Sequence, residues 1–382
     1  MRRIHVIFAA RVAEIMRYIH ERPDWPDFHW DIGTLAGPLA TIRHRQGLLI
    51  GRMNTLGFPI RAEAGLEILT LDVVKSSAIE GEMLDMAQVR SSLARRLGID
   101  IGGLTPVNRN VEGIVEMMLD ATQRYAEPLT EERLFGWHAA LFPLGYGRVR
   151  KITVGAWRTP DAGPMQVVSG YVGNERVHFE APAAERLHKE MRQFLNWFNA
   201  QLDLDPVIKA GIAHFWFVTI HPFEDGNGRI ARAIADCAMA RADECPQRFY
   251  SMSSRIERER NDYHEILEHT QKCTLDITPW LSWFLGCLDR AIDSTETTLA
   301  AIFRKAHVWQ HVGQFPLNER QRDVISRLLC GFEGKLTSSK YAKLTKCSAD
   351  TALRDIRGLL DFGILRQSIA GGRSTSYDLA EL

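Results

Sequence analysis

A segment rich in glycine and charge follows a strongly apolar run in the second half of the chain. The run is Ala210–Ile220, and residues 221–232 after it read His-Pro-Phe-Glu-Asp-Gly-Asn-Gly-Arg-Ile-Ala-Arg. Pro222 bars a regular helix from continuing through the residue before it, whereas the two glycines permit a tight loop. A second helix is expected to begin at about Asn227. The sequence therefore predicts two helices joined by a loop whose backbone N–H groups can approach an anion such as phosphate.

The composition excludes several classes of protein. The chain has 382 residues, with 47 Lys and Arg against 47 Asp and Glu, so its formal net charge is zero. A hydrophobic fraction of 45% argues against disorder, and zero net charge implies no chain-wide patch for nucleic acid. No stretch approaches the roughly 18 apolar residues of a transmembrane helix, and the N-terminus lacks a convincing signal-peptide cleavage site. The six cysteines form no CxxC pair and are interpreted as free thiols, which predicts a cytoplasmic protein without membrane contact.

Helical patterns dominate the rest of the chain, which is long enough for two or three domains. Apolar residues recur at helical spacing in residues 6–19, 35–56, 62–77, 106–125, 130–141, 184–202, 206–220, 228–241, 261–270 and 276–307. Residues 166–172 and 175–179 instead flank a Gly-Asn turn and predict a β-hairpin. Three short helices are expected at 318–330, 337–344 and 348–362, and two strands at 364–367 and 375–379. This last order is typical of a winged helix-turn-helix.

The charged residues of the 221–232 segment suit phosphate chemistry. His221 has a side chain whose ordinary pKa suits a general base. Asp225 can hold a Mg²⁺ ion that also contacts phosphate oxygens. Arg229 and Arg232 are three residues apart on the expected helix, so they share a face and can hold phosphates. A histidine that merely ends a helix is the alternative for His221.

The same segment resembles the signature of the Fic family (filamentation induced by cyclic AMP), HPFx[D/E]GNGRxxR, and matches every defined position. The resemblance implies a protein adenylyltransferase, which transfers AMP from Mg-ATP to a Ser, Thr or Tyr hydroxyl of a target protein. It implies that His221 deprotonates the hydroxyl and that Asp225 binds Mg²⁺. The residues that it implies for ATP binding are Gly226, Asn227, Gly228, Arg229 and Arg232. Gly228 stands where the Doc-like kinases carry lysine, which favours nucleotidyl transfer over phosphorylation.

An upstream segment matches a second pattern of the same family, the inhibitory motif [S/T]xxxE[G/N]. Its defined positions are Ser76, Glu80 and Gly81. The resemblance implies that Glu80 pairs with Arg232, leaves ATP only a non-productive pose, and so inhibits the enzyme from within the chain. It also implies that Glu80 can direct the removal of AMP from a modified target. A plain helix end with Gly81 as the residue after the cap is an alternative that can coexist with inhibition.

Two further regions are assigned by their position in the family. The hairpin lies where Fic proteins carry a flap, whose exposed strand edge can pair with an extended target segment. Val168, Ser169 and Gly170 are predicted to form that docking edge, and an ordinary surface hairpin is the alternative. Asn261 and Tyr263 lie where relatives contact the nucleotide base, and an aromatic face can stack on a purine. A plain core position is the competing interpretation of Tyr263.

The expected fold is all-α: a Fic-type helical core with a small β-hairpin flap, an N-terminal helical region and a C-terminal winged helix-turn-helix. The corresponding domains are residues 1–105 with the inhibitory helix, the catalytic core 106–290, a helical linker 291–316 and the winged helix 317–382. The last domain carries eleven Lys and Arg, with Arg373 in the wing, against eight Asp and Glu. This modest excess leaves DNA as an alternative partner and favours a packing or protein-contact module. A homodimer is also expected, and the alternative function is a DNA-binding transcription regulator with a Fic-derived core.

Overall fold

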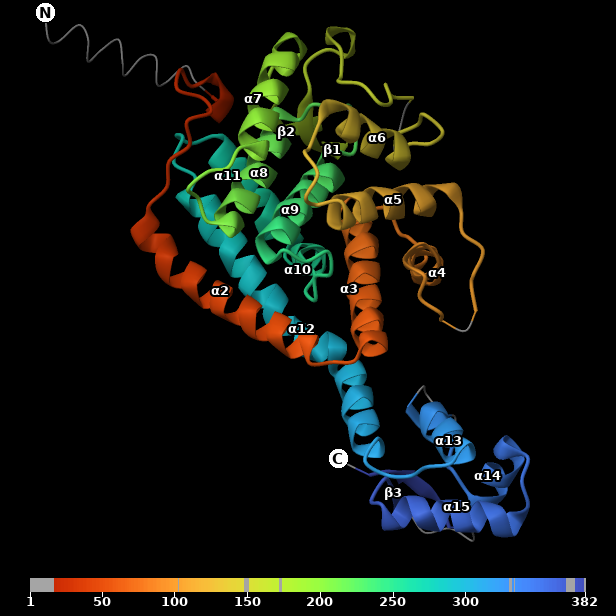
Figure 1. Ribbon diagram of the computed structural model, residues 1–382. Helices are drawn as coiled ribbons and strands as arrows, with labels where there is room; N and C mark the ends of the chain where they lie inside the picture. Colours follow the sequence, from red (N-terminus) through yellow and green to blue (C-terminus); the bar gives the residue numbers. More distant parts are fainter. Residues whose placement is uncertain are drawn as a thin grey trace, which may run out of the picture. The chain divides into compact units, whose positions relative to one another are not determined.

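The structure is a computed structural model that describes residues 17–101, 103–147, 151–171, 174–329, 332, 334–368 and 375–380 (Figure 1). The contacts divide the chain into two compact units, one of residues 1–55 and 61–296, the other of residues 56–60 and 297–382. Most of the helix expected at 6–19 lies outside the described residues. The domain boundaries expected from the sequence stay predictions.

The first unit is built almost entirely from helices, and α12 continues past its boundary. The α-helices are α2 (Ile32–Asn54), α3 (Phe58–Ile79), α4 (Met86–Leu97), α5 (Arg109–Gln123), α6 (Glu131–Leu141), α7 (Leu187–Asn199), α8 (Pro206–Ile220), α9 (Asn227–Asp243), α10 (Met252–Arg258), α11 (Arg260–Gln271) and α12 (Thr278–Val312). Short 3-10 helices lie at η1 (Ile19–Glu21), η2 (Pro160–Ala162) and η3 (Ala184–Arg186). The expected all-α class is confirmed.

Helix α8 lies in the core of this unit, and α9 packs along it (Figure 1). Every side chain of α8 after Pro206 is buried except that of Lys209, because the helix is apolar on all sides. Asp205 caps its amino end by accepting a hydrogen bond from the Val207 N–H. Pro206 takes the first helical position, where no N–H is needed. These signals fix where α8 begins and therefore where His221 follows its last turn.

A buried arginine fastens α3 beside α9. Arg248 contacts Asp72 of α3, with 2.9 Å from Nη2 to Oδ2, and Asp236 of α9, with 2.6 Å from Nη1 to Oδ1. The Ser251 hydroxyl donates to the other oxygen of Asp72 at 2.6 Å. All three charged side chains are at most 3% exposed. The register of α3 against α9 is therefore held by charge pairs as well as by apolar packing.

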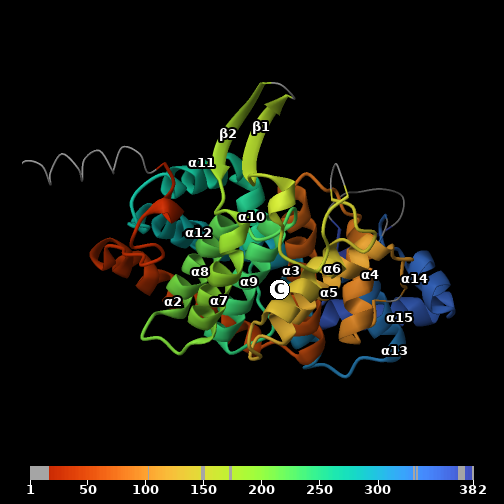
Figure 2. The same cartoon turned by 90° about the horizontal axis from the view of Figure 1, so that it is seen from above.

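The predicted hairpin is confirmed as β1 (Gln166–Tyr171) and β2 (Asn174–Glu180). The strands pair antiparallel with Gln166 opposite Glu180, and the register shifts between Val167 and Val168, as at a β-bulge. Figure 2 shows the two strands projecting beyond the helices. The turn at 172–173 lies outside the described residues.

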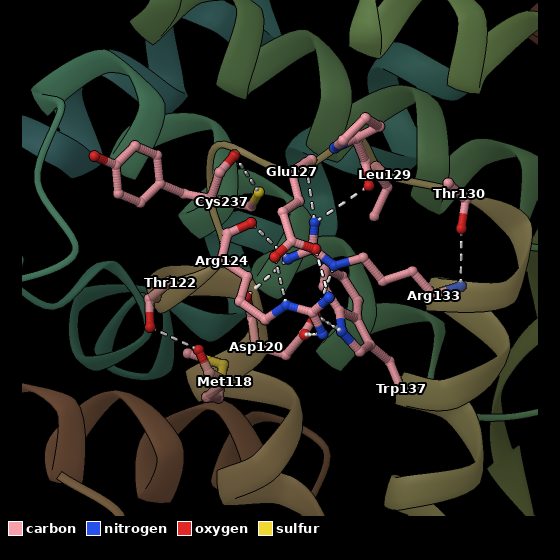
Figure 3. Close-up of polar contacts among 12 residues, drawn as sticks. Met118, Asp120, Thr122, Arg124, Glu127, Leu129, Thr130, Arg133, Trp137 and Cys237 are labelled. Carbon is pink, nitrogen blue, oxygen red and sulfur yellow. Dashed lines mark hydrogen bonds and ion pairs between the residues drawn. The ribbon is translucent and has the colours of Figure 1, made fainter.

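One carboxylate joins α5 to α6 (Figure 3). Oδ2 of Asp120 accepts hydrogen bonds from Arg133 Nε and Trp137 Nε1, each at 2.6 Å. The corner between the helices also receives Arg241 of α9, which donates to the carbonyls of Tyr125 at 2.6 Å and Glu127 at 2.7 Å. Thr130 caps α6 by accepting a hydrogen bond from the Arg133 N–H. These bonds hold the corner against the far end of α9.

Besides the end of α12, the described residues of the second unit form three helices and a strand pair. They are α13 (Glu319–Leu329), α14 (Ser338–Thr345), α15 (Ala349–Asp361), β3 (Leu365–Gln367) and β4 (Tyr377–Leu379). Asp355 of α15 is buried and accepts a hydrogen bond from Arg320 Nε at 2.8 Å. The order of elements agrees with the expectation, whereas the winged-helix assignment stays a prediction. Gly371, Gly372 and Arg373 lie outside the described residues.

Two expectations from composition can be compared with the described residues. No helix among them is both long enough and apolar enough to cross a membrane. The cysteines that they include are free thiols, as expected, and Cys330 lies outside them.

Candidate active site between α8 and α9

His221 directly follows α8 in a left-handed backbone conformation, with φ 52° and ψ 58°. Its backbone N–H bonds the Phe217 carbonyl at 3.0 Å, and its ring Nδ1 lies 3.2 Å from the Val218 carbonyl oxygen. Because a carbonyl can only accept, Nδ1 carries the proton and Nε2 is the basic nitrogen. Burial lowers the pKa of His221 to about 4. The imidazole is therefore neutral at pH 7 and able to accept a proton.

The loop after His221 is braced from within. The Asn227 side chain accepts from the Phe223 N–H at 3.0 Å and donates to the Phe223 carbonyl at 2.8 Å. Gly226 has φ 81°, which glycine adopts without strain, and stands at the N-cap position of α9. No side chain among the described residues caps this helix end. The first-turn N–H groups of α9 therefore form an anion site, and the Asn227 side chain serves the loop.

Glu80 lies at this anion site because of how α3 ends. The N–H of Gly81, at φ 80°, bonds the Ala78 carbonyl at 2.9 Å. The N–H of Glu82 bonds the Ser77 carbonyl at 3.0 Å. This pattern is a Schellman motif, so the expected cap role of Gly81 is confirmed. It fixes the backbone from which the Glu80 side chain projects.

The expected contact between Glu80 and Arg232 is present. Arg232 Nη2 lies 2.7 Å from Glu80 Oε1, and its Nε donates to the Ser76 hydroxyl at 2.9 Å. The Arg232 side chain is 3% exposed and that of Glu80 is 37% exposed. Burial raises the pKa of Glu80, but Arg232 and then Arg229 outweigh it and leave that pKa below its ordinary value. The carboxylate is therefore ionised at neutral pH.

Glu80 fills the space directly over Gly228. A Cβ added to Gly228 would lie 2.2 Å from Glu80 Oε1 and 3.2 Å from Arg232 Nη1. Only glycine leaves room for a carboxylate this close to the first turn of α9. The anion site therefore holds an anion supplied by the chain itself.

A second carboxylate of the same segment contacts the other arginine. Glu82 Oε2 lies 2.6 Å from Arg229 Nη1, and the guanidinium of Arg229 also stacks over the ring of Phe142 at 5.1 Å. The Arg229 side chain is 7% exposed. Both arginines that the sequence assigns to phosphate binding are thus engaged by acidic residues that flank Gly81.

Asp225 lies beside this arrangement, at a pocket of about 430 Å³ that Glu82 and Arg229 also line. Its Oδ1 accepts a hydrogen bond from the Gly226 N–H at 2.6 Å. Among the described residues, no group of three or more His, Cys, Asp or Glu is placed to hold a metal ion. The described residues therefore offer Mg²⁺ no ready-made cage, and Asp225 provides a hard oxygen donor, which fits an ion held mainly by nucleotide phosphates.

A second pocket, of about 560 Å³, opens on the hairpin side of His221. Val168 and Ser169 of β1 line it and are exposed. The Ser169 hydroxyl lies 2.6 Å from His178 Nε2, and His178 Nδ1 lies 2.5 Å from Glu268 of α11. Polar contacts thus join the hairpin to α11. Gly170 follows on β1, opposite Glu175, and docking at this edge stays a prediction.

The residues predicted for the base differ from each other in exposure. Tyr263 also lines the hairpin-side pocket, but it is only 2% exposed and its hydroxyl lies 2.9 Å from His214 Nε2. Burial lowers the pKa of His214 to about 3, so this histidine is a neutral core residue, as its apolar surroundings require. Asn261 is exposed at the start of α11. Base contact by either residue stays a prediction.

The region that contains this geometry matches a known family. Residues 128–239, which include the whole 221–232 segment, match the Fic/DOC family. This part of the chain is therefore a Fic/DOC domain. Residues 18–99 match a domain of unknown function, DUF4172, and that range carries the Glu80 segment. The Fic domain and the segment that occupies its anion site therefore belong to two separately recognised regions.

Curated proteins that are similar to this chain come from animals. A protein named Protein adenylyltransferase Fic from Nematostella vectensis is 25% identical over 226 residues, and one of the same name from Culex quinquefasciatus is 26% identical over 225 residues. Each match covers 58% of this chain, but only 47% and 40% of the respective relative. The chain thus spans less than half the length of these relatives.

Solved structures show the fold. A Fic family protein from Desulfovibrio desulfuricans G20 aligns with a TM-score of 0.57 and 20% identity, covering 90% of this chain and 96% of its own. A Fic domain containing signaling protein from Bacteroides thetaiotaomicron aligns with a TM-score of 0.50 and 22% identity, covering 68% of this chain and 96% of its own. These alignments confirm the Fic-type helical fold.

Three residues of this site escaped the sequence analysis. Glu82 fits no defined position of the inhibitory motif, and only its place beside Glu80 hinted at a role. His138 of α6 is fully buried, with Nε2 at 3.2 Å from the Asp225 carbonyl oxygen and its ring stacked on Phe223 at 4.1 Å. Arg158 bonds the His221 carbonyl at 2.9 Å. Both contacts join residues far apart in the sequence, so no local pattern signals them.

Proposed function

We propose that this Fic protein is a protein adenylyltransferase that transfers AMP from Mg-ATP to a Ser, Thr or Tyr hydroxyl of a protein, and that Glu80 inhibits it from within the chain. The observation that carries the proposal is the Glu80 carboxylate over Gly228, in the anion site of α9 and at the pocket that His221 lines. An anion site beside a neutral histidine base suits nucleotidyl transfer. The names of the curated relatives support the same activity.

The reaction assigns one task to each part of the site. Nε2 of His221 takes the proton of the target hydroxyl, whose oxygen then attacks the α-phosphorus of ATP. The bond between the α-phosphorus and the oxygen bridging to the β-phosphate breaks, and pyrophosphate leaves with that electron pair. The first-turn N–H groups of α9, together with Arg229 and Arg232, stabilise the negative charge. Mg²⁺ beside Asp225 would supply further positive charge to the phosphate oxygens.

Inhibition follows from competition for the same groups. While Glu80 holds Arg232 and covers Gly228, the outer phosphates of ATP lack their counter-charge and their space. ATP then binds only with its α-phosphate out of line with the target hydroxyl. In the same position Glu80 can direct a water molecule onto a bound AMP-modified target, so removal of AMP is part of the proposal.

Labelling with two forms of ATP tests the function. The Glu80→Gly protein, added to a cell lysate, should incorporate label from α-labelled ATP and none from γ-labelled ATP, because AMP is transferred and pyrophosphate leaves. A chase of the labelled proteins with unmutated protein should release AMP. Parallel reactions with labelled UTP and labelled GTP should be run, so that the same experiment measures which nucleotide the enzyme prefers.

The matched control is Glu80→Gly/His221→Ala, which keeps the nucleotide site but lacks the base. Label from α-labelled ATP should disappear in this variant. Incorporation from the γ-phosphate would instead identify a kinase, and label that persists without His221 would contradict the mechanism.

A further inference from the structure

Arg158 carries a buried positive charge that is paired with main-chain oxygens. The residue is 4% exposed and lies in the segment between α6 and the hairpin. Burial lowers the pKa of Arg158 to about 10, so the guanidinium is still charged at neutral pH. Among the described residues it forms no ion pair with a carboxylate. Burying a charge in this way is unfavourable, so stability alone is a poor explanation for an arginine here.

The hydrogen bonds of Arg158 run in two directions. Nε donates to the His221 carbonyl at 2.9 Å, and the backbone N–H of Arg158 donates to the Pro222 carbonyl at 2.9 Å. Nη2 donates to the Pro182 carbonyl at 2.5 Å. Pro182 follows the end of β2, so it belongs to the base of the hairpin. One side chain therefore ties the histidine to the root of the hairpin.

His221 needs such support because its backbone is strained. A non-glycine residue at φ 52° lies in the left-handed region, which is unfavourable for residues with a Cβ. Its carbonyl has left the hydrogen-bond ladder of α8, and Pro222 offers no N–H nearby. The planar guanidinium supplies donors in a fixed geometry, so it can hold the His221 carbonyl and the hairpin root at a set separation.

We infer that Arg158 is a positioning residue that holds the catalytic base His221 in register with the root of the hairpin β1–β2. This inference rests on the proposed function and on the predicted docking of the target at the hairpin edge, which would bring the target hydroxyl to His221. Arg158 touches neither nucleotide nor target in that reaction. Its loss should therefore lower the rate of transfer and leave nucleotide affinity unchanged, because the anion site of α9 remains intact.

Arg241 is a matched control within the same chain. It is partly buried, burial also lowers its pKa, and it likewise donates to main-chain carbonyls, those of Tyr125 and Glu127. It lies in the last turn of α9, at the opposite end from Gly228. Substitution at Arg241 should destabilise the fold much as substitution at Arg158 does, without changing the position of His221.

The test uses the full chain with Glu80→Gly and adds Arg158→Gln, Arg158→Lys, Arg241→Gln or Arg241→Lys. We expect Arg158→Gln to lower kcat for AMP incorporation by about tenfold to a hundredfold, as a displaced catalytic group does, while the Kd for ATP changes by less than about twofold. Arg158→Lys should recover part of kcat, because one donor remains. The Arg241 variants should keep kcat. An unchanged kcat in Arg158→Gln, or an equal loss in Arg241→Gln, would overturn the inference.

A second measurement separates this inference from the proposed function. Hydrogen exchange should speed up in Arg158→Gln at two amides together, those of His221 and Ala181, which bond Phe217 and Met165. Arg241→Gln should change neither. If Glu80→Gly transfers no AMP, the proposed function is wrong, and the exchange rates still decide the role of Arg158. If the exchange rates of the two amides did not change, or changed independently of each other, the positioning role of Arg158 would be contradicted.

Discussion

Gly81 separates two carboxylates that reach two different arginines of α9. Because its N–H and that of Glu82 both bond back to α3, the chain reverses tightly and both acidic side chains face the helix end. Glu80 then contacts Arg232 and Glu82 contacts Arg229. The inhibitory motif as a pattern predicts only the first of these contacts. At the residue scale, two carboxylates contact the two arginines of the site, and Glu80 does not act alone.

The pair of Glu82 and Arg229 yields a prediction about nucleotide affinity. In the Glu80→Gly background, Glu82→Gln should tighten ATP binding by about two- to fivefold, because Arg229 no longer has to leave a charged partner that is 36% exposed. Titration calorimetry with ATP measures this directly. Glu67→Gln is the matched control, since Glu67 is also 36% exposed and pairs with Arg90 at 2.8 Å. Equal affinities in the two variants would show that Glu82 does not compete with phosphate.

At the element scale, the sequence predicted the helices that carry strong local signals. The apolar run of α8, Pro222 after it and the glycines before α9 predicted both helices correctly. The sequence analysis missed helices α4 and α10. Serine and arginine make up five of the 12 residues of α4, and α10 has only seven residues. Arg158 and His138 were missed for a different reason. Their partners lie 63 and 87 residues away, and such contacts arise only from tertiary packing.

The buried histidines of α6 and α8 predict how stability depends on pH. Burial lowers the pKa of His138 to about 4 and that of His214 to about 3, from an ordinary 6.5. The unfolded chain therefore takes up protons first as the pH falls. Their contribution to stability is complete above pH 6.5 and is lost toward pH 4. For His138 alone the loss is on the order of 3 kcal/mol.

Urea unfolding, repeated at several pH values between 7.5 and 4.5, measures this dependence of stability on pH. The free energy of unfolding should fall with pH in the unmutated protein, and it should fall less steeply in His138→Gln, which does not titrate. His307→Gln is the control, because the His307 side chain is exposed on α12 and belongs to neither α6 nor α8. Parallel curves for His138→Gln and the unmutated protein would contradict the assignment.

At the scale of the whole molecule, two recognised regions meet at one anion site. The region that matches DUF4172 supplies Glu80 and Glu82, whereas the Fic domain supplies His221, Arg229 and the amino end of α9. Arg248 locks the two together by pairing with Asp72 on α3 and Asp236 on α9. In the proposed mechanism, release of inhibition requires the Glu80 carboxylate to leave Arg232.

The function and the binding partner of the second unit stay predictions. Its three helices and strand pair agree with the order expected from the sequence, but the partner of that unit follows from neither its charge nor its fold. Because Asp355 is buried against Arg320, it does not add negative charge to the exposed face of α15. Binding of DNA and formation of a homodimer both stay predictions.

The central claim is that the Glu80 carboxylate occupies the site of the ATP phosphates. The most direct test compares AMP incorporation from α-labelled ATP by the unmutated protein and by Glu80→Gly, side by side and with Glu80→Gly/His221→Ala as the blank. We predict at least about tenfold more incorporation by Glu80→Gly. Equal incorporation by the two proteins, above the blank, would contradict the claim.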